Sequence, residues 1–221
     1  MVRRMTITPA QLRAAFAARP PGQCPQQGQV TEHIDEPIPP EIRQRLQTGR
    51  RPAAVLVPIL AERGGPLRLL LTERTAHLRD HAGQISFPGG GLKPDESPLV
   101  AALREAEEEI GLAPAAVEVF GEMPQYHTGT GFSVSPLLGF VAPEARFTPD
   151  PGEVAEIFDV PLDFLLDPRN FHTETRYYRG AWRTFRAVPW SGRYIWGATA
   201  GMLWQLAGIL HGHVPQAQNP R

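Results

Sequence analysis

The sequence has little of several features that would define a class of protein. Cys24 is the only cysteine in 221 residues, so neither a disulfide framework nor a cysteine-based zinc site is expected. No window holds 18 consecutive apolar residues, and no apolar run follows Arg3 and Arg4. A transmembrane helix and a secretory leader are therefore not expected. We expect a cytoplasmic protein without membrane association.

An excess of charge of one sign is also missing. The chain has 22 basic and 23 acidic residues, which gives a formal net charge of -1. This balance provides no broad electrostatic attraction to DNA, RNA or an anionic membrane, so any affinity for phosphate groups must be local. The length allows one domain with a sizeable core. The expected partner is a small molecule, not nucleic acid.

The segment from Gly90 to Leu112, GGLKPDESPLVAALREAEEEIGL, contains a helix with both ends marked. Ser97 followed by Pro98 is typical of an N-cap and a first helical position, and Gly111 is typical of a helix end. The spacing predicts a helix over 98–110. Five residues at helical spacing predict its apolar stripe: Leu99, Ala102, Leu103, Ala106 and Ile110.

Three carboxylates are predicted on the side of this helix opposite the stripe. Glu105, Glu108 and Glu109 lie three and four residues apart, a spacing at which like charges repel each other. Carboxylate oxygens favour Mg²⁺ or Mn²⁺ over zinc, and Mg²⁺ usually binds a few carboxylates together with substrate phosphate oxygens. The pattern predicts a site for a metal and a phosphate group. An acidic, solvated helix face without a ligand is the alternative.

The complete spacing favours the metal site. Seven residues stand at fixed intervals: Gly90, Glu96, Arg104, Glu105, Glu108, Glu109 and Gly111. Such a coincidence has odds on the order of one in a million from average residue usage. The pattern resembles the signature of the Nudix hydrolases at every fixed position. The resemblance implies an α/β fold with a mixed β-sheet between helices (α/β/α), and a pyrophosphohydrolase that depends on Mg²⁺ or Mn²⁺.

The resemblance also implies roles for individual residues. Glu105, Glu108 and Glu109, with the Gly89 carbonyl, would hold the metal, and a carboxylate would take a proton from the attacking water. Glu96 and Arg104 would form a supporting ion pair that orients Glu105.

A further acidic residue commonly follows the motif in this family. Glu153 or Glu156 could fill that catalytic role, or each could be a surface charge.

The preceding segment, LLTERTAHLRDHAGQISFPGG, carries Arg74 and Arg79 before the glycines Gly89 and Gly90. Arginines beside a diphosphate could bind its oxygens, although an isolated pair could equally be surface charges. This segment resembles the one before the motif in the coenzyme A pyrophosphatase branch of the family. The resemblance implies that coenzyme A or a thioester of it is split to 3′,5′-ADP and 4′-phosphopantetheine, with Arg74 or Arg79 on the 3′-phosphate.

Three alternatives remain open. The substrate could be another nucleoside diphosphate derivative, such as NADH or ADP-ribose. The chain could bind nucleotide without hydrolysing it, or the acidic helix could be an interaction surface without a ligand.

The remaining sequence predicts three parts. Residues 1–50 form an N-terminal extension, with short helices over 8–18 and 39–46 and a Pro/Gln-rich loop between them. Residues 51–212 form the Nudix domain, and residues 213–221 form a tail.

Within the predicted domain, strands are expected at 53–60, 67–72, 117–123 and 134–141, with a Gly/Thr-rich loop over 126–132. A short helix over 161–166, an aromatic hairpin over 171–188 and a packing helix over 196–210 follow. The region over 182–196 could face the substrate or form the interface of a homodimer.

Overall fold

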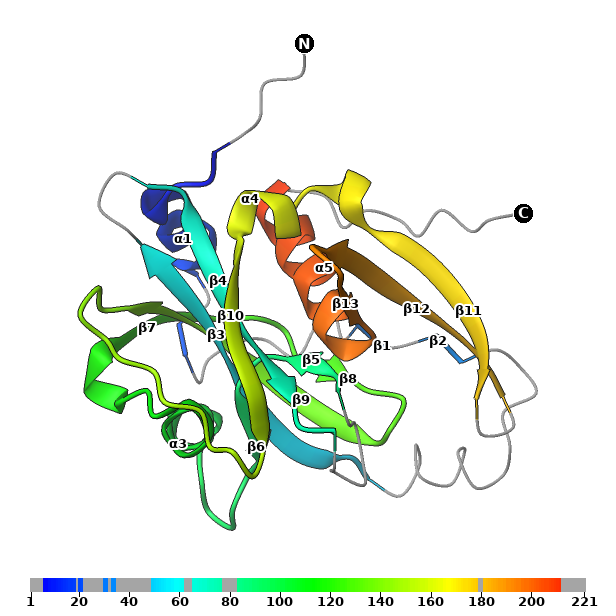
Figure 1. Ribbon diagram of the computed structural model, residues 1–221, viewed down its shortest axis with the longest axis horizontal. Coiled ribbons are helices and arrows are strands. Elements are labelled where there is room, and N and C mark those ends of the chain that lie inside the picture. The colour runs from blue at the N-terminus through cyan, green and yellow to red at the C-terminus, as the bar shows by residue number, and fades with distance from the viewer. Residues whose placement is uncertain are drawn as a thin grey trace.

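The computed structural model describes most of the chain. The described residues are 6–18, 20–21, 30–31, 33–34, 49–61, 65–76, 83–178 and 181–211. They form two β-sheets, with helices on both faces of the larger one (Figure 1). The predicted α/β fold class is confirmed. The helix predicted over 39–46 and the tail over 213–221 lie outside the described residues.

The larger sheet is mixed and is built around two buried central strands. Strands β3 (Arg51–Ala61) and β9 (Phe132–Val141) run parallel and pair over ten residues of each. Strand β4 (Leu67–Arg74) continues from β3 as an antiparallel hairpin, and β10 (Val154–Pro161) pairs with the other side of β4. Near-continuous apolar sequence in β3 and β9 is what a strand covered on both faces requires.

Five shorter strands complete the nine-stranded sheet: β1 (Val30–Thr31), β5 (Ile85–Ser86), β6 (Gly89–Gly91), β7 (Val117–Glu122) and β8 (Tyr126–His127). The four predicted strands are confirmed. The prediction of a loop over 126–132 is wrong for its first two residues, which pair as β8 with β9, and for Phe132, which begins β9. Two residues are too few to show the alternation by which a strand is recognised in a sequence.

The helices begin and end close to their predicted positions. They are α1 (Pro9–Phe16), α3 (Pro98–Ile110), α4 (Leu162–Leu165) and α5 (Ala198–His211), with single turns η1 (Pro114–Ala116) and η2 (Pro168–Asn170). The Thr8 side chain and the Gln11 side chain form a capping box at the start of α1. No helix in the described part of the chain is both long and apolar enough to span a membrane.

The two faces of the large sheet carry separate apolar clusters. Helix α3 covers one face and packs against β3, whereas α1 and α5 contribute to the cluster on the other face. Leu12 and Phe16 of α1 are fully buried in this second cluster. The first helix of the N-terminal extension is therefore part of the core.

A second sheet lies beyond α5. It consists of β11 (His172–Tyr178), β12 (Ala181–Trp190), β13 (Arg193–Trp196) and β2 (His33–Ile34), and the predicted aromatic hairpin is its β11–β12 pair. Figure 1 shows α5 between this sheet and the larger one.

Helix α5 connects the two sheets. The Thr199 hydroxyl donates a hydrogen bond to the Ile85 carbonyl at 2.9 Å. Gly201 lies so close to the Tyr126 ring that a Cβ at this position would collide with it.

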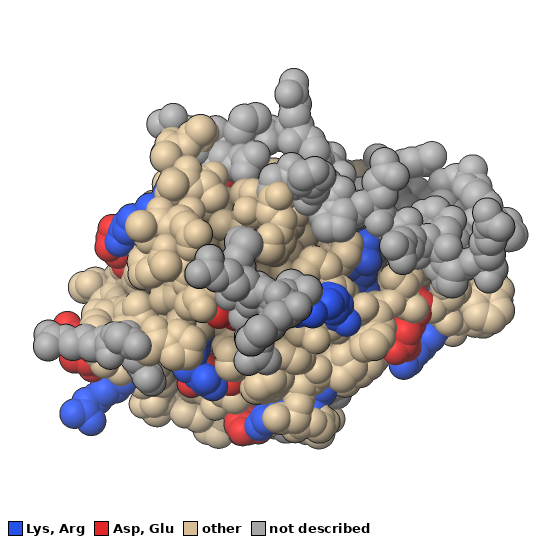
Figure 2. All heavy atoms as spheres, turned by 90° about the horizontal axis from the view of Figure 1, so that it is seen from above, with Lys and Arg blue, Asp and Glu red and all other residues tan. Residues whose placement is uncertain are grey.

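Charged residues are interspersed on the surface shown in Figure 2. Basic and acidic side chains lie near one another there and do not gather by sign, as the nearly balanced composition predicts.

Candidate active site

Helix α3 has the ends that its sequence predicts. The Ser97 side chain accepts a hydrogen bond from the Val100 N–H, and Gly111 ends the helix in the left-handed conformation with φ of 65°. These two caps fix which residues are helical and so determine the direction of each carboxylate along the helix.

The packing of α3 differs from the predicted apolar stripe. Ala102, Ala106 and Ile110 are fully buried as predicted, but Leu99 and Leu103 are only partly buried. The prediction that all three carboxylates lie opposite the buried side is wrong, because Glu109 is itself buried, with 4% exposure. The helix packs on β6 as well as on β3, so its buried side extends toward the glycines of β6.

Close contact between β6 and α3 depends on glycine. A Cβ at Gly90 would lie 2.6 Å from the Glu105 carboxyl carbon, and a Cβ at Gly89 would collide with the backbone of Ala54 and Val55. Gly89 also has a positive φ of 153°, which disfavours other residues. The glycines therefore let the backbone of β6 lie directly against the carboxylates.

Glu96 and Arg104 form the predicted ion pair. Arg104 donates from Nε to Glu96 Oε1 at 2.7 Å and from Nη2 to Oε2 at 2.9 Å, and the Lys93 N–H donates to the same carboxylate at 2.8 Å. These hydrogen bonds, with that from Arg104 the strongest, lower the pKa of Glu96 to about 2. The loop before α3 is thereby attached to the helix.

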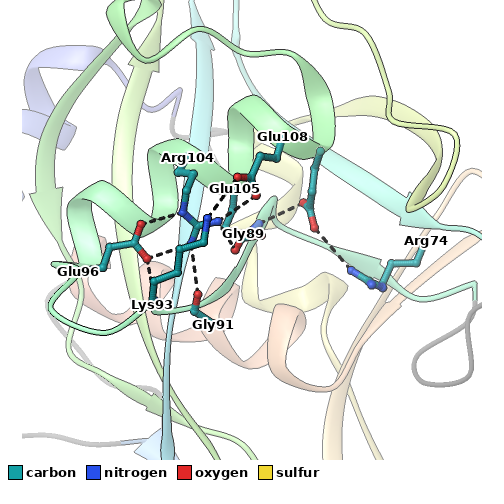
Figure 3. Close-up of polar contacts among 9 residues, drawn as sticks. Arg74, Gly89, Gly91, Lys93, Glu96, Arg104, Glu105 and Glu108 are labelled. Carbon is teal, nitrogen blue, oxygen red and sulfur yellow. Dashed lines mark hydrogen bonds and ion pairs between the residues drawn. The ribbon is translucent and has the colours of Figure 1, made fainter.

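Arg104 also connects two of the three carboxylates on α3. Its Nη1 donates to Glu105 at 2.7 Å and to Glu108 at 2.9 Å, as Figure 3 shows. The Lys93 ammonium lies 3.6 Å from the other oxygen of Glu108. One cationic atom therefore occupies the point where oxygens of Glu105 and Glu108 converge.

Glu109 faces the other side of the site. Its Oε2 accepts a hydrogen bond from the Gly89 N–H at 3.1 Å, and its Oε1 lies 3.6 Å from Nη1 of Arg74. Burial raises the pKa of Glu109 to about 7, and the negative charges of Glu153 and Glu105 act in the same direction. A carboxyl group that titrates near neutral pH suits acid–base chemistry.

Arg74 lies between two acidic residues but is poorly satisfied by them. Its Nη2 is 3.7 Å from Glu153 Oε2, so both of its ion pairs are longer than a hydrogen bond. Its Nε is buried and has no hydrogen-bond acceptor among the residues that the structure describes. Arg79, the second arginine predicted to bind substrate, lies outside the described residues.

The turn before β10 places Glu153 beside Arg74. The Asp150 N–H donates to the Glu109 carbonyl at 2.9 Å, and the Thr75 N–H donates to the Glu153 carbonyl at 3.0 Å. The Asp150 side chain closes the turn by accepting from the Gly152 N–H at 2.8 Å. Asp150 and Thr75 were not among the predicted site residues, although the turn itself is recognisable from its Pro-Asp-Pro-Gly sequence.

Glu156, the other acidic candidate, is not brought into this group. It accepts a hydrogen bond from Arg193 of β13 at 2.6 Å, and the same guanidinium lies over the Phe158 ring at 4.3 Å. Phe158 packs on the α1 and α5 side of the sheet, whereas Ile157 packs on the α3 side. Glu156 therefore points with Phe158, away from α3.

The donor groups fit a hard divalent cation, although they do not converge as they stand. No three acidic or histidine side chains meet at one point in the ranges that the structure describes, because Arg104 holds Glu105 and Glu108 while Gly89 and Arg74 contact Glu109. All three groups are carboxylates, Glu105 and Glu109 lie against the glycine strand β6, and Glu109 is a buried acid that a cation would stabilise.

Comparisons with known proteins match the chain to one domain family. A model of the NUDIX domain matches residues 49–180, more than half of the chain. The chain is 41% identical over 164 residues to a protein of Escherichia coli O7:K1 named Uncharacterized Nudix hydrolase NudL, covering 74% of this chain and 84% of that protein. A protein of the same name from Citrobacter koseri is 41% identical over 159 residues, covering 72% and 82%.

Among solved structures, the Nudix hydrolase RenU of M. smegmatis is similar with a TM-score of 0.45 and 27% identity, covering 52% of this chain and 73% of that one. Nudix hydrolases generally act on small molecules and need a divalent metal. By the domain match and the extent of identity to its relatives, this chain belongs to the Nudix hydrolase family.

Proposed function

We propose that the chain is a metal-dependent hydrolase that cleaves the diphosphate of coenzyme A, or of its thioesters, to 3′,5′-ADP and 4′-phosphopantetheine. The observation that carries the proposal is the position of Arg74. Its Nε is buried without a hydrogen-bond acceptor among the described residues, and its Nη1 lies 3.6 Å from Glu109. A diphosphate oxygen is a suitable acceptor for such a guanidinium.

Glu105, Glu108, Glu109 and the Gly89 carbonyl are the groups that would hold the cation. Mg²⁺ or Mn²⁺ bound by them supplies charge neutralisation on the diphosphate and lowers the pKa of a bound water. Arg104 holds Glu105 and Glu108 at 2.7 and 2.9 Å, and it would release one or both of them to a bound cation. Its two hydrogen bonds to Glu96 keep helix α3 attached to the loop that precedes it.

The protein's own residues direct the hydrolysis. Arg74 binds and orients the diphosphate, and the N–H of Gly89 holds Glu109 in place. As a water oxygen bonds to one phosphorus, the bond from that phosphorus to the bridging oxygen breaks, and a carboxylate takes the proton of the water. Glu109 is well placed to take this proton, because burial raises its pKa to about 7. Glu153 restrains Arg74 from the opposite side.

The proposal of coenzyme A as the substrate depends on the sequence of the segment before α3. Leu70 to Thr72, Arg74, Arg79, Gly83 and Phe87 to Gly90 resemble the pattern that precedes the motif in the coenzyme A pyrophosphatase branch. Arg74 or Arg79 is the proposed contact for the 3′-phosphate.

The test is a comparison of substrates with analysis of products by mass spectrometry. Purified protein is incubated with coenzyme A, NADH or ADP-ribose, with Mg²⁺, with Mn²⁺ or with a chelator. We expect 3′,5′-ADP and 4′-phosphopantetheine to accumulate only with a metal, and coenzyme A to have the highest kcat/KM. Preferred turnover of NADH or ADP-ribose would refute the substrate, and nucleotide binding without turnover would refute the hydrolase.

A further inference from the structure

Strand β11 is an open edge of the second sheet. It pairs with β12 from His172 opposite Ala187 to Tyr178 opposite Ala181, and with no other strand of the described chain. Figure 1 shows β11 as the outermost strand of this sheet. An edge strand presents unpaired N–H and C=O groups that a further strand can join. Its residues Thr175, Arg176 and Tyr177 are exposed.

The sequence of this edge is complementary to itself. Glu174 and Arg176 flank Thr175. If two copies pair antiparallel about a two-fold axis at Thr175, Glu174 of each copy lies opposite Arg176 of the partner subunit. A register centred on Glu174 would instead place two carboxylates opposite each other, and one centred on Arg176 would oppose two guanidinium groups. Charge therefore selects the register centred on Thr175.

The charges already present in one chain favour the same arrangement. Arg176 lies opposite Arg183 of β12, and like charges in opposite positions repel. Arg176 is bound at 2.7 Å by Glu174 of its own strand, which also accepts the Tyr194 hydroxyl. In the paired edge, Glu174 of the partner subunit enters the row of Arg176 and Arg183 and reduces their repulsion.

The other face of the strand carries groups that a second copy would cover. Tyr177 and Trp182 pack against each other with ring centroids 5.6 Å apart and are 63% and 53% exposed. Beside them, the hydroxyls of Thr175 and Thr184 lie 2.9 Å apart. Pairing about Thr175 continues this threonine row into the partner subunit and places the partner's Thr173 beside Tyr177.

We propose that β11 is the interface of a homodimer, in which two copies pair antiparallel about a two-fold axis at Thr175 and join their second sheets. The contact is isologous, so it closes with two copies and leaves no further β11 edge exposed. A seven-residue strand is a small interface, so the dimer dissociates on dilution.

Cysteine cross-linking tests the register. In a Cys24→Ser background, Thr175→Cys places two thiols opposite each other at a Cα separation of about 4.5–5.5 Å, within disulfide range. Thr173→Cys is the matched control, because it lies on the same face of β11 but opposite Tyr177 of the partner subunit. We expect a disulfide-linked dimer from Thr175→Cys alone. No cross-link, or equal cross-linking of both variants, would overturn the proposal.

Charge exchange tests the energetics. Sedimentation velocity from micromolar to millimolar protein should show a concentration-dependent dimer of the wild type and a monomer of Arg176→Glu, whose substitution replaces a side chain that is 58% exposed. The double variant Glu174→Arg/Arg176→Glu restores both opposite-charge pairs and should restore the dimer.

A wild type that stays monomeric throughout, or an Arg176→Glu variant that dimerises like the wild type, would overturn the proposal. Thermal unfolding of each variant verifies folding. The measurement needs no substrate, so its outcome is independent of coenzyme A hydrolysis.

Discussion

Replacing Glu109 with glutamine should reduce activity and raise stability at the same time. Glutamine keeps the shape of the side chain and an oxygen that can accept the Gly89 N–H, now 3.1 Å from Glu109 Oε2, but it removes the negative charge. Loss of a carboxylate that binds metal or takes the proton should lower kcat by about 10²–10⁴-fold with Mg²⁺ present.

The stability gain follows from the pKa of Glu109. Burial raises this pKa from 4.5 to about 7, so between these values the unfolded chain loses the proton while the folded protein keeps it. The contribution to stability is complete below pH 4.5 and is lost as the pH rises through 7. A pKa shift of this size corresponds to about 3 kcal/mol of folding stability. The wild type loses this stability as the pH rises, and Glu109→Gln should not.

The assay is urea unfolding in a metal-free buffer with a chelator, at several pH values between 4 and 8. The wild-type free energy of unfolding should fall by about 3 kcal/mol relative to that of Glu109→Gln across this range. Glu108→Gln is the matched control, because the Glu108 side chain is 54% exposed and its replacement should change stability little. Parallel pH profiles of wild type and Glu109→Gln would refute the burial argument, and near-normal turnover would remove Glu109 from the chemistry.

Substitutions at three further positions, Arg74, Asp150 and Phe16, test other contacts. Arg74→Ala should raise the KM for coenzyme A at least tenfold and Arg74→Lys less, since a lysine keeps the charge but not the fork of donors; steady-state kinetics that show no change for either would exclude Arg74 from binding. Asp150→Ala should lower kcat, whereas Asp150→Asn should retain it because asparagine keeps the oxygen that closes the turn. If Asp150 acts through Glu153, Asp150→Ala should lower kcat little further in a Glu153→Gln background. Additive losses of kcat would contradict that link. Phe16→Ala removes a fully buried ring and should lower the free energy of unfolding, measured by urea titration, by about 3–5 kcal/mol. A decrease below about 1 kcal/mol would show that the core does not need α1.

Local signals in the sequence were sufficient to predict both ends of helix α3. Ser97, Pro98 and Gly111 act on neighbouring backbone, so the ends of the helix could be predicted without knowing what it packs on. The Glu96–Arg104 pair spans eight residues of one loop and helix, and it was expected only through the family resemblance.

Contacts between distant segments could not be predicted from the sequence. The burial of Glu109 depends on β6 lying against α3, and the placement of Glu156 depends on Arg193, which is 37 residues further along and in the other sheet. The spacing of Glu153 and Glu156 does not show which of them lies near Arg74. The sequence therefore treated the two residues alike, and the structure distinguishes them.

The three glycines of β6 also determine how the site meets a ligand. They are hydrogen-bonded to β3 opposite Ala53, Ala54 and Val55, so the backbone that faces the carboxylates is a sheet strand and not a free loop. A ligand arriving there finds amide groups already in their final positions and spends little of its binding free energy on ordering them. Flexible side chains, above all Arg104, would then exchange their partners when a ligand binds, while the backbone of β6 stays in place.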